Sequence, residues 1–364
     1  MAKSDSPSSE RAELPLATGD LVDRRFRIEK LLAEGGMGVV YVATDLVRGD
    51  RVALKCLSVI TAEMAELVAR FERELELAAR LKSPYTTRVI RSGLLPSGSP
   101  YLAMELLEGE DLSRVLKSGR KLPIPVAVDC ILEVCDAIDE MHGFGMVHRD
   151  LKPSNLFVSQ GPDGRTVMKL LDFGLAKMVD DAATPELRMT LTSELLGTPA
   201  YMSPEQVKSS GEVDARTDVW SLGVILFELL TGKVPFGSSP IGNVLMAIVQ
   251  ESPPSIASLR KDVPAELEAI VDKCLTKPLA YRFQSVRELA RALSPLGTGD
   301  IVVHSAGAPR NRDPMATVPE LDGSVHTGGP WQALGIDSTD EAPDTRRDAH
   351  DAPTIAGGGK RPKT

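Results

Sequence analysis

The stretch His148-Arg149-Asp150-Leu151-Lys152-Pro153-Ser154-Asn155 decides the fold of this chain, read together with Asp172-Phe173-Gly174 downstream. The first stretch offers a carboxylate that can accept a proton from a hydroxyl group, and a lysine two residues further on. The amide of Asn155 and the carboxylate of Asp172 supply oxygen atoms, the ligands that Mg²⁺ prefers. The combination predicts a phosphoryl-transfer centre, provided that the rest of the chain supplies a nucleotide site.

The composition, 364 residues with 42% hydrophobic and 26% charged, is that of a globular protein with one or two folded units. The formal net charge of -9 argues against an extended nucleic-acid surface, so no nucleic-acid partner is expected. The four cysteines show neither metal-ligand spacing nor a disulfide framework, which indicates a reducing, cytoplasmic setting. The polar first residues lack a signal-peptide core, and no apolar run approaches the ~20 residues of a membrane span.

The N-terminal part of the chain reads as strands around a glycine-rich turn. Residues 1–19 are rich in Ser, Pro and charge and predict a flexible arm. From Phe26 an extended pattern leads into Ala33-Glu34-Gly35-Gly36-Met37-Gly38 and resumes at Val39-Val40-Tyr41-Val42. Such a hairpin could let backbone N–H groups approach phosphate oxygens. An ordinary flexible β-turn is the alternative, and for an isolated glycine cluster it is the more common one.

A strand and a helix follow this hairpin. Residues 51–57 form a strand pattern in which Lys55 stands among apolar neighbours. Apolar positions at three- and four-residue spacing predict a helix between 61 and 81, with Glu74 on the margin of its buried stripe. A carboxylate near a core needs a partner, and Lys55 could be that partner. A solvated Glu74 is the alternative.

The second half of the chain is mainly helical. A strand at 100–107 and a polar connection at 108–111 suit a boundary between two lobes. Beyond them, apolar residues at helical spacing from Ala127 to Met141 predict a helix that ends just before His148. Cys130 and Cys135 on this helix are interpreted as packing residues, because a free cysteine behaves as a small hydrophobe.

The two motifs quoted first resemble those of the eukaryotic-type protein kinase family, and the run Glu34-Gly35-Gly36-Met37-Gly38-Val39-Val40-Tyr41 looks like its bacterial Ser/Thr branch. The resemblance covers roughly residues 20–297. It implies an α+β, bilobal fold with a mainly antiparallel β N-lobe at 20–107, containing one regulatory helix, and a larger, mainly α C-lobe at 108–297. Residues 298–364, with one aromatic residue and no periodicity, predict a disordered tail.

The resemblance assigns roles to the catalytic residues. Asp150 would be the catalytic base, and Lys152 would steady the γ-phosphoryl group of ATP. Asn155 and Asp172 would hold Mg²⁺, with Mn²⁺ as a second candidate. Lys55, held by Glu74, would reach the α- and β-phosphates. The other expected ATP-binding residues lie in the glycine-rich hairpin, the strands and the hinge: Ala33, Gly35, Gly36, Met37, Gly38, Val40, Ala53, Met104 as gatekeeper, Glu105 and Leu107 at the adenine, and Asp111 at the ribose.

The long connection from Asp172 to Glu205 resembles an activation loop. A guanidinium at Arg149, beside the base, attracts an anion, and phosphorylation of Thr190 or Thr192 could supply it, with Ser193 as a further candidate. The alternative is that these hydroxyls are polar loop residues without a role.

Three more residues are expected to support this loop and the lobe. Thr198 matches the threonine that bonds the catalytic Asp and Lys of Ser/Thr kinases. Glu205 would pair with Arg282, and Asp218 would brace the catalytic loop from a buried helix ending near Gly232.

The chain departs from the family pattern at three places. Ala33 replaces the first glycine of the hairpin, which would cost on the order of 1 kcal/mol if the backbone there needs positive φ. Ser154 stands where arginine-directed relatives carry glutamate, which leaves substrate preference open. Ser203 stands where many relatives have alanine.

Two hypotheses follow from the sequence. The first is an active Ser/Thr protein kinase that acts on protein substrates and is activated by autophosphorylation, through a transient homodimer. The second is a non-catalytic nucleotide-binding scaffold; the presence of Asp150, Asp172 and Lys55 argues against it. A small-molecule kinase is disfavoured by the segment 197–205, which would shape a peptide groove. Thr354 in the tail could bind a phosphothreonine-binding partner, and a linker without a role is the alternative.

Overall fold

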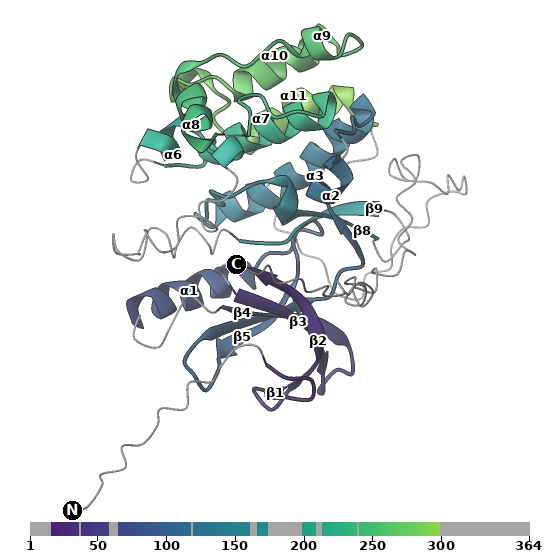
Figure 1. The fold of residues 1–364 in the computed structure, drawn as a ribbon, viewed down its shortest axis with the longest axis vertical. Helices are drawn as coiled ribbons and strands as arrows, with labels where there is room; N and C mark the ends of the chain where they lie inside the picture. The colour runs from purple at the N-terminus through teal and green to yellow at the C-terminus, as the bar shows by residue number, and fades with distance from the viewer. Residues whose placement is uncertain are drawn as a thin grey trace, which may run out of the picture.

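The computed structural model describes residues 16–35, 38–57, 65–117, 119–160, 166–173, 199–208, 213–238 and 240–298. Two lobes follow one another along the chain (Figure 1): a six-stranded sheet with helix α1 beside it, and a larger helical lobe with a three-stranded sheet on the side that faces the first. The predicted bilobal α+β fold is confirmed. The predicted residues Gly36, Met37, Thr190, Thr192, Ser193, Thr198 and Thr354 lie outside the described residues.

The N-lobe sheet is antiparallel throughout, with strand order β1-β2-β3-β4-β6-β5. Its elements are β1 (Leu21–Val22), β2 (Phe26–Gly35), β3 (Gly38–Asp45), β4 (Arg51–Leu57), β5 (Val89–Leu94) and β6 (Pro100–Glu105), with α1 (Ala65–Ala78) between β4 and β5. Within the predicted span of 61–81, the helix ends at Ala78, and residues 61–64 lie outside the described residues. The strand predicted at 51–57 coincides with β4.

Alternation along β4 separates the two faces of this sheet. Val52, Leu54 and Cys56 pack into an outer cluster of the N-lobe. Ala53 and Leu57 belong instead to the large core shared by α1 and the C-lobe. Because side chains alternate along a strand, Lys55 lies on the same inner face as Ala53 and Leu57. The sheet thus presents the lysine toward the second lobe.

The N-terminal boundary of the fold lies earlier than the sequence predicts. The backbone N–H of Leu16 donates to the hydroxyl of Tyr41 at 2.7 Å, and the N–H of Gly19 donates to the carbonyl of Ile28 at 2.8 Å. These contacts fix residues 16–19 to the sheet, so this part of the predicted flexible arm is wrong. At the other end, the N–H of Thr298 donates to Asp129 at 3.1 Å, so the fold extends to the first residue of the predicted tail.

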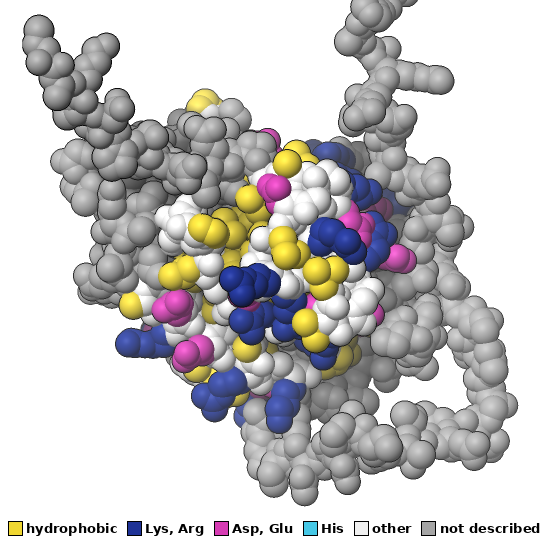
Figure 2. Space-filling view, turned by 90° about the horizontal axis from the view of Figure 1, so that it is seen from below, with side chains coloured by type: hydrophobic (Ala, Val, Ile, Leu, Met, Phe, Trp, Pro, Cys, Tyr) yellow, Lys and Arg dark blue, Asp and Glu magenta, His cyan; other side chains and the backbone are white. Residues whose placement is uncertain are grey.

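The outer end of the N-lobe is rich in basic side chains. Figure 2 shows Lys and Arg side chains on this face among hydrophobic ones. The N-lobe also has exposed hydrophobic side chains, such as Val47. Acidic side chains balance some of this charge, for example in the ion pairs Arg25–Asp45 at 2.6 Å and Arg91–Asp23 at 2.5 Å. The second of these pairs holds the turn between β1 and β2 against the sheet.

The C-lobe is built around α7 (Arg216–Thr231), almost every residue of which is buried. The helix ends at Gly232, whose φ of 73° is left-handed and whose position leaves no room for a Cβ, since one would lie 2.3 Å from the carbonyl oxygen of Gly119. The other helices are α2 (Leu112–Leu116), α3 (Ile124–Gly143), α6 (Pro204–Lys208), α8 (Ile241–Gln250), α9 (Ile256–Leu259), α10 (Ala265–Cys274) and α11 (Val286–Leu293), with 3-10 turns η1 (Pro153–Asn155), η2 (Pro199–Tyr201), η4 (Leu279–Tyr281) and η5 (Ser294–Leu296).

A small antiparallel sheet lies between these helices and the N-lobe. It consists of β7 (Gly109–Asp111), β8 (Leu156–Gln160) and β9 (Thr166–Leu170), in that order. The sequence analysis did not predict these short strands. No described helix is both long enough and apolar enough to span a bilayer.

Candidate active site

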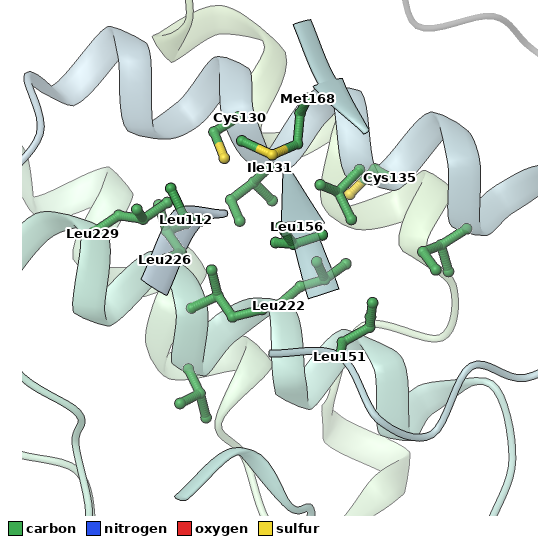
Figure 3. Packing of buried hydrophobic residues seen from close by; sticks show 14 of the residues in the cluster. Leu112, Cys130, Ile131, Cys135, Leu151, Leu156, Met168, Leu222, Leu226 and Leu229 are labelled. Carbon is green, nitrogen blue, oxygen red and sulfur yellow. The ribbon is translucent and has the colours of Figure 1, made fainter. Parts of the chain in front are cut away.

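The loop His148–Asn155 is anchored by two leucines that enter the C-lobe core. Leu151 and Leu156 are 1% and 0% exposed, and Figure 3 shows them among Ile131 of α3 and Leu222 of α7. Cys130 and Cys135 lie in the same core and are fully buried, which agrees with their interpretation as packing residues; burial raises the pKa of both thiols. Apolar anchors on both sides hold the intervening polar residues at the surface of the core.

Asp218 of α7 binds the start of this loop through two backbone N–H groups. Its Oδ2 accepts from the N–H of His148 at 3.0 Å and its Oδ1 accepts from the N–H of Arg149 at 2.9 Å. Oδ2 also lies 2.8 Å from Nε2 of His142 on α3. Burial opposes ionisation of Asp218, but these contacts outweigh it and keep its pKa below the usual value. The carboxylate therefore joins α3, α7 and the loop.

His148 links the loop to Asp172. Its Nε2 lies 2.7 Å from the carbonyl oxygen of Asp172, a distance at which the ring nitrogen must donate. The other ring nitrogen, Nδ1, then accepts from the N–H of Asp150 at 3.3 Å. This buried histidine fixes the backbone of both predicted catalytic carboxylates, and the sequence analysis assigned it no role.

The side chain of Asp150 is held by its neighbours in the loop. Lys152 Nζ donates to Asp150 Oδ2 at 2.7 Å. Asn155 Nδ2 donates to the Asp150 carbonyl at 2.9 Å and to Oδ2 at 3.3 Å. Among the residues that the structure describes, no side chain or N–H donates to Asp150 Oδ1, so this oxygen can accept a proton from a hydroxyl group.

Asn155 and Asp172 come together because β8 pairs with β9. Leu156 is opposite Leu170 in this ladder, and the N–H of Leu171 donates to the carbonyl of Asn155 at 2.9 Å. Asn155 therefore stands just before one strand and Asp172 just after the other, at the same edge of the sheet. Their amide and carboxylate oxygens are hard ligands that fit Mg²⁺. In the part of the chain that the structure describes, nothing donates to Asn155 Oδ1, which leaves that oxygen available.

Lys55 pairs with Asp172 in this structure, and the pair with Glu74 predicted from the sequence is not formed here. Lys55 Nζ lies 2.9 Å from Asp172 Oδ2, and the described residues contain no contact of Lys55 with Glu74. Burial disfavours the charge of Asp172, yet Lys55, His148 and the N–H of Phe173 lower its pKa below the usual value. A buried carboxylate needs a cation nearby, and Lys55 on the inner face of β4 supplies it.

Glu74 lies in a different electrostatic setting. It is half-buried on α1, and loss of hydration raises its pKa, while the charge of Arg149 acts in the opposite direction. The charge of Arg149 is thus the one that acts on the pKa of Glu74. The sequence predicted correctly that Glu74 is near the core, but spacing alone could not show which cation it approaches.

The predicted ATP-binding residues of the strands share one surface. Val40, Ala53 and Met104 all contact the large core cluster on the inner face of the sheet, and Ala53 is directly opposite Met104 in the ladder of β4 and β6.

In the glycine-rich hairpin, Gly38 has a φ of 151°, and a Cβ there would lie 2.1 Å from the carbonyl oxygen of Cys56. Ala33 of β2 has no positive φ and pairs with Val40 of β3. Its methyl group therefore does not carry the free-energy cost of about 1 kcal/mol expected for a residue with positive φ. Gly35 pairs with Gly38 and has open space around it.

The hinge is held by a contact between residues far apart in the sequence, which no local pattern predicts. Glu105 Oε1 accepts from Lys169 Nζ of β9 at 2.9 Å and from the N–H of Arg88 at 2.9 Å. The N–H of Glu105 donates to the carbonyl of Arg88 at 3.0 Å, so both the side chain and the backbone of Glu105 are held at this end of β6.

The other predicted hinge residues lie next to it. Leu107 follows β6 and is partly buried. Asp111 caps α2 by accepting from the N–H of Arg114 at 3.2 Å, and it also contacts the Arg114 side chain at 3.3 Å. Any contact of Asp111 with a ribose would compete with this cap.

The segment after the predicted activation loop is tied to the C-lobe by a buried ion pair. Arg282 contacts both oxygens of Glu205, at 2.7 and 3.1 Å, and its side chain is fully buried. The guanidinium also lies 5.1 Å from the ring centroid of Trp220. Glu205 therefore pairs with Arg282, as the sequence predicted. Ser154, the substitution noted in the sequence, is exposed in η1.

A bilobal fold with a carboxylate held by lysine and asparagine, and an aspartate opposite a strand lysine, defines the class of protein kinases. The chain belongs to the protein kinase family, because residues 26–291 match the protein kinase domain.

Several known bacterial proteins are similar to this chain. The probable serine/threonine-protein kinase SCO3848 of Streptomyces coelicolor is 36% identical over 269 residues, covering 73% of this chain and 39% of that protein. Serine/threonine-protein kinase pkn3 of Myxococcus xanthus is 35% identical over 266 residues, covering 72% and 48%. The crystal structure of the Mycobacterium tuberculosis PknI kinase domain matches with a TM-score of 0.60 and 28% identity, covering 78% of this chain and 100% of that one. The chain thus spans less than half the length of the two curated relatives.

Proposed function

We propose that the protein is an active Ser/Thr protein kinase that transfers the γ-phosphoryl group of ATP to hydroxyl groups of protein substrates. The observation that carries the proposal is the arrangement of Asp150, whose Oδ2 is held by Lys152 and Asn155 while Oδ1 stays available. Family membership and the relatives named as Ser/Thr kinases support the same reaction. Lysine at 152 matches the Ser/Thr version of the motif.

The residues of the chain divide the work. Asp150 Oδ1 would orient the substrate hydroxyl and take its proton, and Lys152 would then neutralise charge on the transferred group. Lys55 would hold the α- and β-phosphates, and the carbonyl of Glu105 and the N–H of Leu107 would hold the adenine beneath Val40 and Ala53. Asn155 and Asp172 would hold Mg²⁺, which would neutralise negative charge on the phosphates. Mn²⁺ uses the same kind of ligand and is a second candidate.

Activation is proposed to follow phosphorylation of Thr190 or Thr192, with Thr198 completing the substrate side. The supporting feature is Arg149, whose guanidinium could bind a phosphate and whose charge already acts on Glu74. A phosphate there would draw Arg149 away from Glu74 and let α1 bring Glu74 toward Lys55. We further propose that autophosphorylation takes place in a transient homodimer and that the tail binds a phosphothreonine-binding partner. The proposed location of the protein is the cytoplasm.

The central test is the intact mass of the purified protein after incubation with Mg-ATP, beside the variant Asp150→Asn. We expect the wild type to gain phosphate, on itself or on added protein substrates, and the variant to gain none. A wild type that binds ATP but transfers no phosphate would favour the non-catalytic scaffold. Equal phosphate gain in both proteins would exclude Asp150 as the base. Mapping the phosphates, followed by replacement of Thr190 and Thr192 with alanine, tests the activation sites.

A further inference from the structure

Ser203 and Gln206 form a reciprocal pair of hydrogen bonds at the start of α6. The N–H of Gln206 donates to Ser203 Oγ at 3.3 Å, and the N–H of Ser203 donates to Gln206 Oε1 at 3.0 Å. This is the capping box expected for a serine followed three residues later by glutamine. The serine that departs from the alanine of many relatives thus fixes the direction of the glutamine side chain.

The capping box aims the amide of Gln206 at the catalytic loop. Gln206 Nε2 donates to the carbonyl oxygen of Arg149 at 2.7 Å. The orientation of the amide is determined by its partners, because Oε1 must accept from an N–H and Nε2 must donate to a carbonyl. A flipped amide would lose both bonds. Glu205, the preceding residue, points instead to Arg282, so α6 connects two parts of the lobe.

Arg149 is the residue for which such support matters most. Its φ of 62° lies in the left-handed region, which is unfavourable for a residue with a Cβ and is maintained only where the surroundings hold it. Asp218 holds the N–H of Arg149 at 2.9 Å, and Gln206 holds its carbonyl. The peptide group that carries this carbonyl is the one that begins Asp150.

The two supports are themselves connected. Ser203 Oγ lies 2.7 Å from Oγ1 of Thr217, the residue before Asp218 on α7, and both hydroxyl residues are fully buried. The capping box, which holds the carbonyl of Arg149, and the carboxylate, which holds its N–H, are therefore both fixed to the first turn of α7.

We propose that Gln206 is a positioning residue for Asp150, and that it couples the segment beside the substrate groove to the catalytic loop through the carbonyl of Arg149. Ser203 sets the direction of the glutamine amide. Loss of the Gln206 bond removes the hydrogen bond to the carbonyl of this left-handed residue, so Asp150 is less well placed for the hydroxyl group. The inference rests on the proposed role of Asp150 as base.

The test compares Gln206→Glu with Ser203→Ala. Glutamate can still accept from the N–H of Ser203, since it is the other residue of the capping box, but its carboxylate cannot donate to Arg149. We expect Gln206→Glu to lower kcat about tenfold, the loss corresponding to one hydrogen bond, with a KM for ATP within about twofold of the wild type. Its melting temperature should fall modestly, because the new carboxylate faces the carbonyl of Arg149. Ser203→Ala keeps the Gln206 amide that donates to Arg149, so its kcat should stay closer to the wild type than that of Gln206→Glu. Its melting temperature should fall, because the buried hydrogen bond to Thr217 is lost.

ATP hydrolysis without a protein substrate separates positioning of the base from damage to the groove. Gln206→Glu should lower hydrolysis and protein phosphorylation by the same factor. Three results would each overturn the inference. The first is a wild-type kcat in Gln206→Glu, and the second is a loss confined to protein phosphorylation. The third is a loss of kcat in both variants that is proportional to their loss of melting temperature. Asp150→Asn is measured alongside: if it is inactive and Gln206→Glu is not, only the present inference fails, whereas an active Asp150→Asn removes the proposed base and the inference with it.

Discussion

Lys55 of the N-lobe and Asp172 of the C-lobe are joined by an ion pair of 2.9 Å, with side chains only 19% and 15% exposed. The lysine expected to pair with Glu74 is thus engaged by the carboxylate expected to bind metal. In this arrangement the lobes are linked through Lys55, and the pKa of Glu74 is affected by the charge of Arg149. Catalysis as proposed needs Asp172 for a cation, so Lys55 must exchange this partner for phosphate and Glu74.

Replacement of Glu74 by glutamine separates stability from activity. Burial already raises the pKa of Glu74, so a neutral glutamine loses no stabilising charge, and we expect the melting temperature at pH 7 to stay equal or rise. The kcat should fall by at least about tenfold, because glutamine cannot form the ion pair with Lys55 that the proposed active state needs. Glu72→Gln, at an exposed position of α1, is the matched control and should change neither quantity. A clear fall in the melting temperature of Glu74→Gln would mean that Glu74 already has a stabilising partner.

The glycine-rich hairpin offers a paired prediction. Gly38→Ala should destabilise the protein by about 1–3 kcal/mol and raise the KM for ATP, because the new Cβ would overlap the carbonyl of Cys56. Ala33→Gly should leave the KM for ATP within about twofold, since Ala33 already lies in β2 without positive φ. Urea unfolding and steady-state kinetics measure both effects. A large gain in ATP affinity for Ala33→Gly would show that the alanine does obstruct the nucleotide.

The sequence predicted the residues of the site better than their partners. Motif order placed Asp150, Asn155 and Asp172 at one centre, because each depends on local strand and loop patterns. The partner of Lys55 depends on the position of α1, which apolar spacing does not determine. The support of Glu105 by Lys169 also joins segments far apart in sequence, and no local signal reports it.

Two smaller features, the capping box at Ser203 and the short strands β7–β9, differ in how clearly the sequence predicts them. The Ser-x-x-Gln pattern at Ser203 predicts a capping box and was noted only as a departure from alanine. The strands β7, β8 and β9 are short, and alternation over three to five residues is weak evidence for a strand.

A buried carboxyl group on α3 should make stability depend on pH. Burial raises the pKa of Glu133 to about 8, although the N–H of Met168 donates to it at 2.7 Å. An acid whose pKa is higher in the folded state than the ~4.3 of an unfolded chain stabilises the fold below ~4.3, and this contribution is lost as the pH rises toward 8. Glu133→Gln keeps the acceptor for Met168 and cannot ionise. Its melting temperature should match the wild type at pH 5 and exceed it at pH 8; equal values at both would exclude ionisation of Glu133 as the cause.

Asp218 should be the most sensitive polar residue of the C-lobe core. Asp218→Asn turns one acceptor oxygen into an N–H₂ group that faces the donors of His148, Arg149 or His142. We expect a loss of about 3–5 kcal/mol in the free energy of unfolding, measured by urea denaturation, as for a buried charge network deprived of one member. The kcat should fall as well, because Arg149 would lose the bond that holds its N–H. Asp214→Asn is the matched control: Asp214 contacts Arg216 at 2.6 Å but its side chain is 49% exposed, so that change should cost less than about 1 kcal/mol. If both variants lost the same stability, burial would not be what makes Asp218 important, and its role would reduce to that of an ordinary surface ion pair.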